Sequence, residues 1–510
     1  MSARYLIILF LLFVAADGIS QQSDLLMGRG HSAMLEREIQ RKSMSIHLGA
    51  KPYQVKLFQD TVSYSFLTDS TKYYSKEMAL LMRDHLLKKK TKDYFIALDP
   101  LMDFQYGNDF ALPKDVEHNK RNLLNMRGLV LQGDIGKRFS FNSGFYEVQI
   151  LAPRYIDYGV DTSGIMPGWG RTKYYKTHGY DYSMSFGNLS LAILKNWNVQ
   201  IGYGKHFIGH GYRSLFLTDG VFNAPYIKSS ATFFEGKLFY TTTYSTLQSL
   251  ERLPLGDTPE SLFKRKGASF HYLSYKPNAT IEIGLFEGTI WQRVDSIRTY
   301  HSPWNTMVPI IGVNTAIEGL NGSNNVYGGL NVRINLPYSI SVYGQYLIDD
   351  LDNDRAGYQV GLHVFDCVIP RLNIRAEYNH VGDFVYAGAT ALESITHFNQ
   401  PLGHPSGGAT DELIIMADYK WKRLFGRVKY NQIEKGIGPE GQWNTTYSDL
   451  STSSDQSRFV GHFNAESGIK LNLKTDLEVY LGYTQRHSGE FTNFVYFGIR
   501  TNLHNSYFDF

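Results

Sequence analysis

The chain lacks the features that define several common protein classes. It has one cysteine, Cys367, in 510 residues, which excludes an intramolecular disulfide, and no cysteine lies near the expected signal cleavage region to carry a lipoprotein anchor. Beyond the N-terminus it has no apolar run of the length that a transmembrane helix needs, about 20 residues. Its net charge of +3, from 51 basic and 48 acidic residues, gives no electrostatic case for nucleic acid as a partner.

Aromatic residues and glycine, by contrast, are abundant. The chain has 36 Tyr, 31 Phe and 47 Gly, yet its mean hydropathy is only -0.28. A transmembrane β-barrel produces this combination because only every second residue of a strand meets lipid.

The alternation is clearest near the C-terminus. Within residues 476–484, one strand face carries Leu477, Val479, Leu481 and Tyr483, and the other face carries mainly polar residues. Similar runs precede and follow this one. The chain then stops on Phe510, and a terminal aromatic shortly after such a strand resembles the assembly signal of outer-membrane barrels.

Strand-like runs continue through most of the chain. They predict an all-β membrane protein, an antiparallel transmembrane barrel of about 18 strands over residues 92–510, in the outer membrane of a Gram-negative cell. Long connections at roughly 153–179, 291–323, 383–409 and 435–457 belong outside the cell, and short turns belong at the periplasmic side. The predicted strands are 92–103, 125–136, 138–152, 180–194, 197–209, 224–234, 236–248, 266–276, 279–290, 324–336, 338–349, 356–367, 370–382, 410–421, 424–434, 458–472, 475–486 and 491–504.

The N-terminal part has a different pattern. Residues 1–20 have the basic start, apolar core and small-residue cleavage site of a signal peptide. Residues 21–91 contain two stretches with helical spacing, 32–44 and 75–88. We therefore expect residues 21–91 to form a helical segment at the periplasmic mouth that partly plugs the barrel.

The residues expected to face the lumen carry charges of both signs. Because opposite charges in a crowded lumen tend to pair, a filled ion-pair network is favoured over a conducting channel, which remains the alternative. The expected lumen network consists of Arg333, Arg375, Glu377, Glu466, Lys470, Glu478 and Arg500.

Two segments concentrate polar and aromatic groups that suit a ligand. The first, residues 202–215, combines glycines with Lys205, His206, His210, Tyr212 and Arg213. Its histidines have no nearby carboxylate that would favour a metal, and it lacks the spacing of a phosphate-binding loop, so we expect neither a metal nor a cofactor. A bent strand that packs against the lumen contents is the simpler reading.

The second segment lies in a loop of extracellular size. Its imidazole, amide and aromatic groups suit the hydroxyls and C–H faces of a sugar, but they would equally suit a loop that folds inward as a lid. The candidate ligand residues here are His397, Asn399, Gln400 and His404. We expect the loops 212–219 and 396–404 to form a ligand-facing surface.

These two segments also carry a resemblance to a known family. The stretches GKHFIGHGYRSLFLTDGVFNAPYIK (204–228) and ITHFNQPLGHPSGG (395–408) resemble characteristic segments of the Wzi-like capsule-assembly barrels, most closely the gliding-motility branch called RemB. The likeness runs from about residue 30 to the end. It implies an outer-membrane barrel with a periplasmic helical bundle that binds or organises capsule or exopolysaccharide and supports gliding. It implies no catalytic residues.

Three functions follow as hypotheses. The first is a non-enzymatic barrel that binds surface polysaccharide, with outer-membrane lipid and gliding or secretion proteins as further partners. The second is an accessory component of a secretion or motility machine that acts through protein contacts. The third is a diffusion porin, against which the mixed lumen charges argue. An enzyme is not expected, since the sequence has no Gly-x-Ser-x-Gly elbow.

Overall fold

The structure is a computed structural model. It describes residues 24–55, 75–112, 120–176, 178–253, 263–294, 301–320, 324–350, 355–438 and 456–510. The expected signal peptide, residues 1–20, lies outside the described residues.

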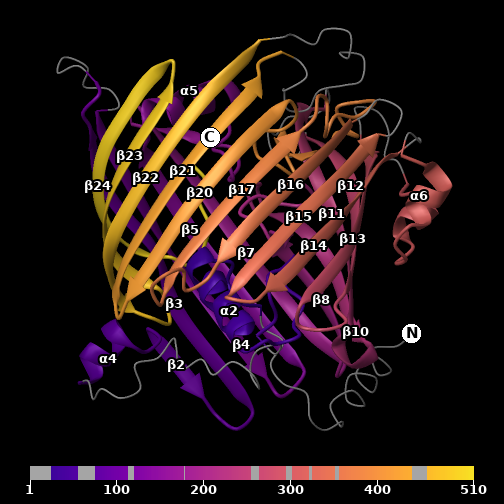
Figure 1. Cartoon of the computed structure of the whole chain (residues 1–510), viewed down its shortest axis with the longest axis horizontal. Helices are drawn as coiled ribbons and strands as arrows, with labels where there is room; N and C mark the ends of the chain where they lie inside the picture. Colours follow the sequence, from indigo (N-terminus) through magenta and orange to yellow (C-terminus); the bar gives the residue numbers. More distant parts are fainter. Residues whose placement is uncertain are drawn as a thin grey trace.

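The chain forms a closed antiparallel barrel of 18 strands, which confirms the predicted fold (Figure 1). Each predicted run corresponds to one wall strand. The barrel closes where the last strand pairs with the first along Asp103–Asp109. The wall strands are β3 (Tyr94–Asp109), β4 (Arg121–Ile135), β5 (Phe139–Leu151), β7 (Gly179–Leu194), β8 (Trp197–Gly204), β10 (Ala224–Phe233), β11 (Leu238–Arg252), β12 (Phe263–Tyr275), β13 (Ile281–Val294), β14 (Asn325–Leu336), β15 (Ile340–Asp350), β16 (Arg355–Val364), β17 (Leu372–Val381), β20 (Thr410–Trp421), β21 (Leu424–Gly436), β22 (Ser457–Asn472), β23 (Leu477–Ser488) and β24 (Glu490–Thr501).

The outer face of the wall is apolar. Side chains such as Leu129, Leu189, Ile201, Val360 and Leu481 point outward and are exposed, while their strand neighbours point into the lumen. This is the alternation that a lipid-facing barrel requires. Among the described residues, no helix is long and apolar enough to cross a membrane. The closed barrel with its apolar outer face identifies the chain as an outer-membrane β-barrel, and its short turns mark the periplasmic end.

Two elements differ from the sequence prediction. The second helix, α4 (Lys76–Met82), is shorter than the predicted stretch 75–88, because residues Leu87–Lys90 form strand β2 and pair with β3. Strand β8 ends at Gly204 rather than at 209, because the chain turns into the lumen there. A short strand β9 (Phe207–Ile208) follows inside the barrel.

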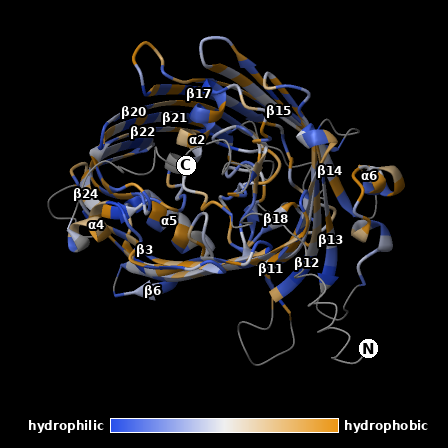
Figure 2. Cartoon of the chain, turned by 90° about the horizontal axis from the view of Figure 1, so that it is seen from below, coloured by the Kyte–Doolittle hydropathy of each residue, from blue (hydrophilic) through white to orange (hydrophobic). Residues whose placement is uncertain are grey.

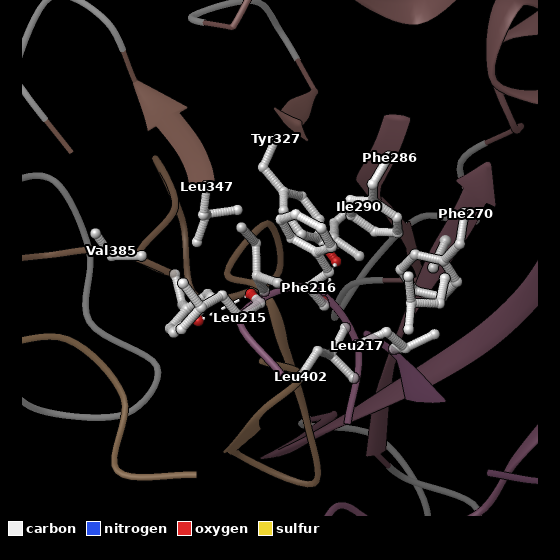
Figure 3. Close-up of a cluster of buried hydrophobic side chains, with 14 of the residues drawn as sticks. Leu215, Phe216, Leu217, Phe270, Phe286, Ile290, Tyr327, Leu347, Val385 and Leu402 are labelled. Atoms are coloured by element: carbon white, nitrogen blue, oxygen red, sulfur yellow. Dashed lines mark hydrogen bonds between the residues drawn. The ribbon is translucent and has the colours of Figure 1, made fainter. Parts of the chain in front are cut away.

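The lumen contains a hydrophobic core of its own (Figure 3). Two extracellular loops, 205–223 and 382–409, fold inward and pack on aromatic and aliphatic side chains that the wall points inward. Phe216 stacks on Phe286 with ring centroids 4.8 Å apart, and Tyr327 donates a hydrogen bond to the Phe216 carbonyl (3.2 Å). Because these side chains are shielded from water, the centre of the barrel is packed as a protein interior rather than as an aqueous channel. The buried cluster includes Leu215, Phe216, Leu217, Phe270, Phe286, Ile290, Tyr327, Leu347, Val385, Ile395 and Leu402.

The N-terminal segment fills the periplasmic half of the lumen. Helix α2 (Arg29–Arg41) lies inside the ring of strands (Figures 1 and 2). Arg37 pairs with Asp366 of a periplasmic turn (2.6 Å), and the Glu282 carboxylate of β13 accepts hydrogen bonds from the main chain of Leu48 and Gly49. Strand β1 (Ala50–Lys51) then pairs with β9, which joins this segment to the inward-folded loop 205–223.

The C-terminal tail also lies in the lumen. Strand β24 ends at Thr501, and residues 502–510 run back through the barrel toward its extracellular end. Phe510 lies there, with its main-chain oxygen accepting a hydrogen bond from Arg486 (2.9 Å). In the folded protein, Phe510 therefore belongs to the lumen filling.

Candidate functional site

Arg213 joins three separate parts of the chain at the centre of the lumen. Its guanidinium lies 2.8 Å from Glu412 of β20 and 3.3 Å from Asp509 of the C-terminal tail. Glu377 of β17 accepts hydrogen bonds from the backbone N–H groups of Tyr212 and Arg213 (2.6 and 3.0 Å). All five residues are buried. The inward loop, the wall and the tail are thus held together by charge-assisted hydrogen bonds, which are stronger than those between neutral groups.

The tail carboxylate Asp509 has a second set of partners. It accepts hydrogen bonds from Tyr212 Oη and Lys429 Nζ, each at 2.6 Å. Although burial alone would raise it, the pKa of Asp509 is held well below its usual value by the charges of Arg213 and Lys429. Asp509 is therefore ionised at neutral pH and anchors the tail.

The other residues of the first predicted segment contact protein atoms. Lys205 Nζ donates to the Gly168 carbonyl (2.7 Å), and burial lowers the pKa of Lys205 to about 8 against the opposing effect of Asp219. The His206 ring packs edge-on against Tyr226. His210 is buried, with its Nε2 3.8 Å from Glu282. These groups hold the inward loop in place.

The second predicted segment folds inward, which is the lid alternative of the sequence analysis. His397 Nδ1 accepts from the Gln248 N–H (3.0 Å), and its Nε2 lies 3.1 Å from the Asn223 carbonyl. Asn399 Oδ1 accepts from the Leu250 N–H (3.1 Å). The segment thereby covers the extracellular end of β11. Pairing of β11 with β10 stops at Ser245, so this end is not paired with β10 along that edge.

Gln400 and His404 complete this arrangement. The Gln400 side chain accepts from the Gly168 N–H (2.7 Å) and donates to the Trp169 carbonyl (3.1 Å), so it joins two extracellular loops. His404 Nε2 lies 2.8 Å from Glu412, the carboxylate that also binds Arg213. The two predicted segments are therefore brought together, but around protein partners in the interior. Direct contact of these side chains with a sugar stays a prediction.

Buried neutral histidines make the lumen filling sensitive to acid. Burial lowers the pKa of His210 to about 3 and that of His397 to about 4, whereas an unfolded histidine titrates near 6.5. Below about pH 6.5 these histidines bind protons in the unfolded chain but not in the folded chain, so the folded state loses stability as the pH falls toward 4. Each histidine contributes a loss of about 1.4 kcal/mol for each pH unit. We expect the thermal midpoint in detergent to fall from pH 7 to pH 5, and to fall less in His210→Asn. Equal falls in both proteins would contradict a role for His210.

The seven predicted network residues form three groups rather than one. Arg333 and Arg375 each lie 3.6 Å from Glu36 of α2 and hold the N-terminal segment. Glu377 belongs to the Arg213 centre. The remaining four lie together near the periplasmic end, where Arg500 binds Glu466 (2.6 Å) and Glu478 (2.8 Å), and Lys470 lies 3.6 Å from Glu478.

A cavity of about 340 Å³ lies beside this periplasmic group. Its lining is strongly charged, but Arg427, Arg500 and Lys470 are paired with Glu466, Glu478 or Asp476. The charges of these three residues are compensated within the protein.

A second cavity, of about 180 Å³, opens at the extracellular side of the tail. Three cations line it at the upper ends of neighbouring strands: Lys435 of β21, Arg458 of β22 and Arg486 of β23. Lys435 donates to the Ser406 carbonyl, and Arg486 to the main chain of Phe510. Among the described residues, none of the three pairs with a carboxylate side chain. Apolar surface completes the lining, with Pro401, Pro405, Tyr507 and Phe510.

This cavity contains groups that sequence reasoning missed. Of the nine candidate ligand residues, only Arg213 and Gln400 line it. Lys435, Arg458 and Arg486 had no distinguishing signal except their place near the ends of alternating strands. Glu412 and Asp509, the partners of Arg213, were missed because no local pattern sets them apart.

The fold and this interior define an outer-membrane β-barrel with a filled lumen. No family model and no curated protein matches the sequence. Among solved structures, the chain is similar to Wzi of Escherichia coli, described as a carbohydrate-binding β-barrel involved in group 1 capsule assembly, with a TM-score of 0.56 and 11% identity over 96% of this chain and 100% of that one. OprD of Pseudomonas aeruginosa matches with a TM-score of 0.42 and 12% identity over 84% of this chain and 98% of that one. At this identity the similarity to Wzi shows the fold alone.

Proposed function

We propose that the chain is a non-enzymatic outer-membrane barrel that binds an acidic surface polysaccharide at its extracellular mouth. The observation that carries this proposal is the cluster of Lys435, Arg458 and Arg486 around the upper cavity. Among the described residues, none of these three cations pairs with an Asp or Glu side chain. Cations of this kind suit the carboxylates of uronic acids, and the rings of Tyr507 and Phe510 suit the C–H faces of sugars. The filled lumen argues against a diffusion porin.

The likeness to Wzi, itself described as carbohydrate-binding, supports the same class of ligand. The resemblance of segments 204–228 and 395–408 to the RemB-like branch adds the proposal that polysaccharide binding supports gliding motility. In this proposal the inward loops act by shaping the cavity, because Gln400 and Arg213 line it. The other candidate residues do not line the cavity and instead fix the position of the loops through contacts with other parts of the protein.

The test measures binding of a polyuronate and of a neutral glucan to the purified full-length barrel. We expect alginate to bind and dextran not to bind, and salt to weaken the binding. The double variant Lys435→Gln/Arg458→Gln should bind alginate about tenfold more weakly or worse, because a hydrogen bond to a charged group contributes about 1.5–3 kcal/mol and 1.4 kcal/mol is a factor of ten.

Arg293→Gln is the matched control. Arg293 is an exposed arginine at the extracellular end of β13, away from the cavity, and it donates to Thr246 Oγ1 (3.0 Å). Its replacement should leave alginate binding unchanged. Equal losses in both variants would indicate non-specific attraction. Unchanged binding in the double variant would exclude the cavity as the binding site.

A further inference from the structure

The barrel wall has a polar patch on its lipid-facing side. Thr242 of β11, His271 of β12 and Glu287 of β13 are paired across neighbouring strands and point outward. The same face of β13 carries Ile283 and Leu285, which are exposed to the membrane. His271 and Glu287 are nonetheless buried. An uncovered carboxylate would be costly at this position, since Glu287 lies near the middle of its strand and hence at bilayer depth.

Residues 301–318, here called the cover, bury this patch. The cover contains η3 (Trp304–Met307) and α6 (Val313–Glu318), and it lies outside the ring of strands (Figures 1 and 2). Glu287 accepts hydrogen bonds from the N–H groups of Gly312 and Thr315, both at 2.8 Å. An extracellular connection therefore folds down over the outer wall and is held there by the patch.

The cover's own backbone is satisfied by the wall. Tyr240 Oη donates to the Pro309 carbonyl (3.1 Å) and Tyr244 Oη to the Met307 carbonyl (2.9 Å). Irregular backbone is tolerated at membrane depth only where protein groups satisfy its hydrogen bonds. These tyrosines meet that requirement for the two carbonyls.

The polarity of the cover is inverted relative to a loop in water. Its polar side chains Asn305, Thr306 and Asn314 are buried, and they bond within the cover: Asn305 donates to Asn314 Oδ1 (3.3 Å) and Thr306 to the Pro303 carbonyl (2.7 Å). Its large exposed side chains are apolar: Trp304, Met307, Ile310 and Ile317 are 71%, 50%, 58% and 49% exposed. Of Asp, Glu, Lys and Arg, the cover contains only Glu318, which accepts a hydrogen bond from Asn305 (3.1 Å). In water this surface would be unfavourable, whereas in hydrocarbon it continues the lipid-facing surface of Ile283 and Leu285.

We propose that the cover is a membrane-embedded element whose outer face binds the acyl chains of membrane lipid. The occupant is lipid because the apolar face is continuous with the lipid-facing wall and lies at its depth. The barrel thus has a thickened sector at β11–β13, where polar wall groups hold an external loop within the bilayer. This inference is independent of the proposed function.

Spin-label accessibility in phosphatidylcholine nanodiscs tests the proposal. In full-length protein with Cys367→Ser, single labels at Ile310→Cys and Ile317→Cys are compared with the wall reference Leu481→Cys and the periplasmic-turn reference Tyr338→Cys. We expect both cover labels to have the high oxygen and low nickel-complex accessibility of position 481, with a ratio several-fold above that at 338. Nickel accessibility like that at 338 would overturn the proposal, and protection from both reagents would indicate a protein occupant and overturn it as well.

A second measurement needs no label on the cover. Brominated phosphatidylcholine should quench the fluorescence of the unsubstituted protein more than that of Trp304→Phe, because the exposed Trp304 ring would lie among the acyl chains. Trp291→Phe is the matched control, since this tryptophan is buried under the cover and donates to Ser302 Oγ (3.2 Å). Equal quenching of the unsubstituted protein and Trp304→Phe would place Trp304 outside the hydrocarbon and overturn the proposal.

Discussion

Arg213→Gln is expected to destabilise the folded protein by about 3–5 kcal/mol, the usual cost of removing one partner of a buried charge cluster. The substitution leaves Glu412 and Asp509 without the cation that neutralises both. Because Arg213 is one of the groups that bind Asp509, the end of the tail should also be held less tightly in the lumen. Two measurements check this: the unfolding free energy in detergent, and the rate at which carboxypeptidase removes Phe510 from the folded barrel.

Arg41→Gln is the matched control for this experiment. Arg41 belongs to the lumen helix α2 and pairs with Glu38 at 2.8 Å, but its side chain is 57% exposed. A solvated pair contributes little to stability, so no measurable change is expected. If Arg213→Gln behaved like Arg41→Gln, or if the tail stayed resistant to carboxypeptidase, the cluster would not hold the loop and tail together.

The second large effect concerns conductance in planar bilayers. The full-length protein is expected to show no stable large pore, because the core of Leu215, Phe216 and Leu402 fills the lumen. Deleting residues 24–55 should not open it, since this core is built from loops that the wall strands carry. Replacing both 209–222 and 386–404 by short Gly-Ser linkers should produce large conductance steps, because it removes the core from within the barrel.

The deletion in this experiment stops at residue 55 for a structural reason. Strand β2 (Leu87–Lys90) pairs with β3 in the wall, so a longer deletion would damage the barrel itself. Each variant must retain the heat-dependent electrophoretic shift of a folded barrel. A stable pore in the full-length protein would favour the porin hypothesis and weaken the polysaccharide proposal.

Sequence periodicity was informative wherever structure depends on neighbouring residues. Alternation located the wall strands, because lipid and lumen impose opposite requirements on successive side chains. It failed at the ends of strands, as at β8, where the chain turns into the lumen after Gly204. It also included the first residues of β2 in the predicted helical stretch 75–88, because a four-residue strand is defined by its partner β3 and has little periodicity of its own.

The candidate site shows the limit of local reasoning more clearly. The sequence identified Arg213 and Gln400 as groups worth attention, but it left open whether their loops face a ligand or fold inward. That choice depends on Glu412, Asp509 and Gly168, which are far away along the chain. In the same way, no sequence signal marks Lys435, Arg458 and Arg486, because they become a cluster only when the ends of β21, β22 and β23 lie next to each other.

The sequence by itself thus determined an outer-membrane barrel, its strands and the difference between short turns and long loops. Only the tertiary structure decided that two of those loops and the tail fill the lumen, that a third loop covers the outer wall, and that Lys435, Arg458 and Arg486 line one cavity. The physical reason is that strand alternation responds to the two solvents on either side of the wall, which act on every residue locally. The path of a loop is instead decided by a few contacts, such as Arg213 with Asp509 and Glu287 with α6, between residues that no sequence pattern connects.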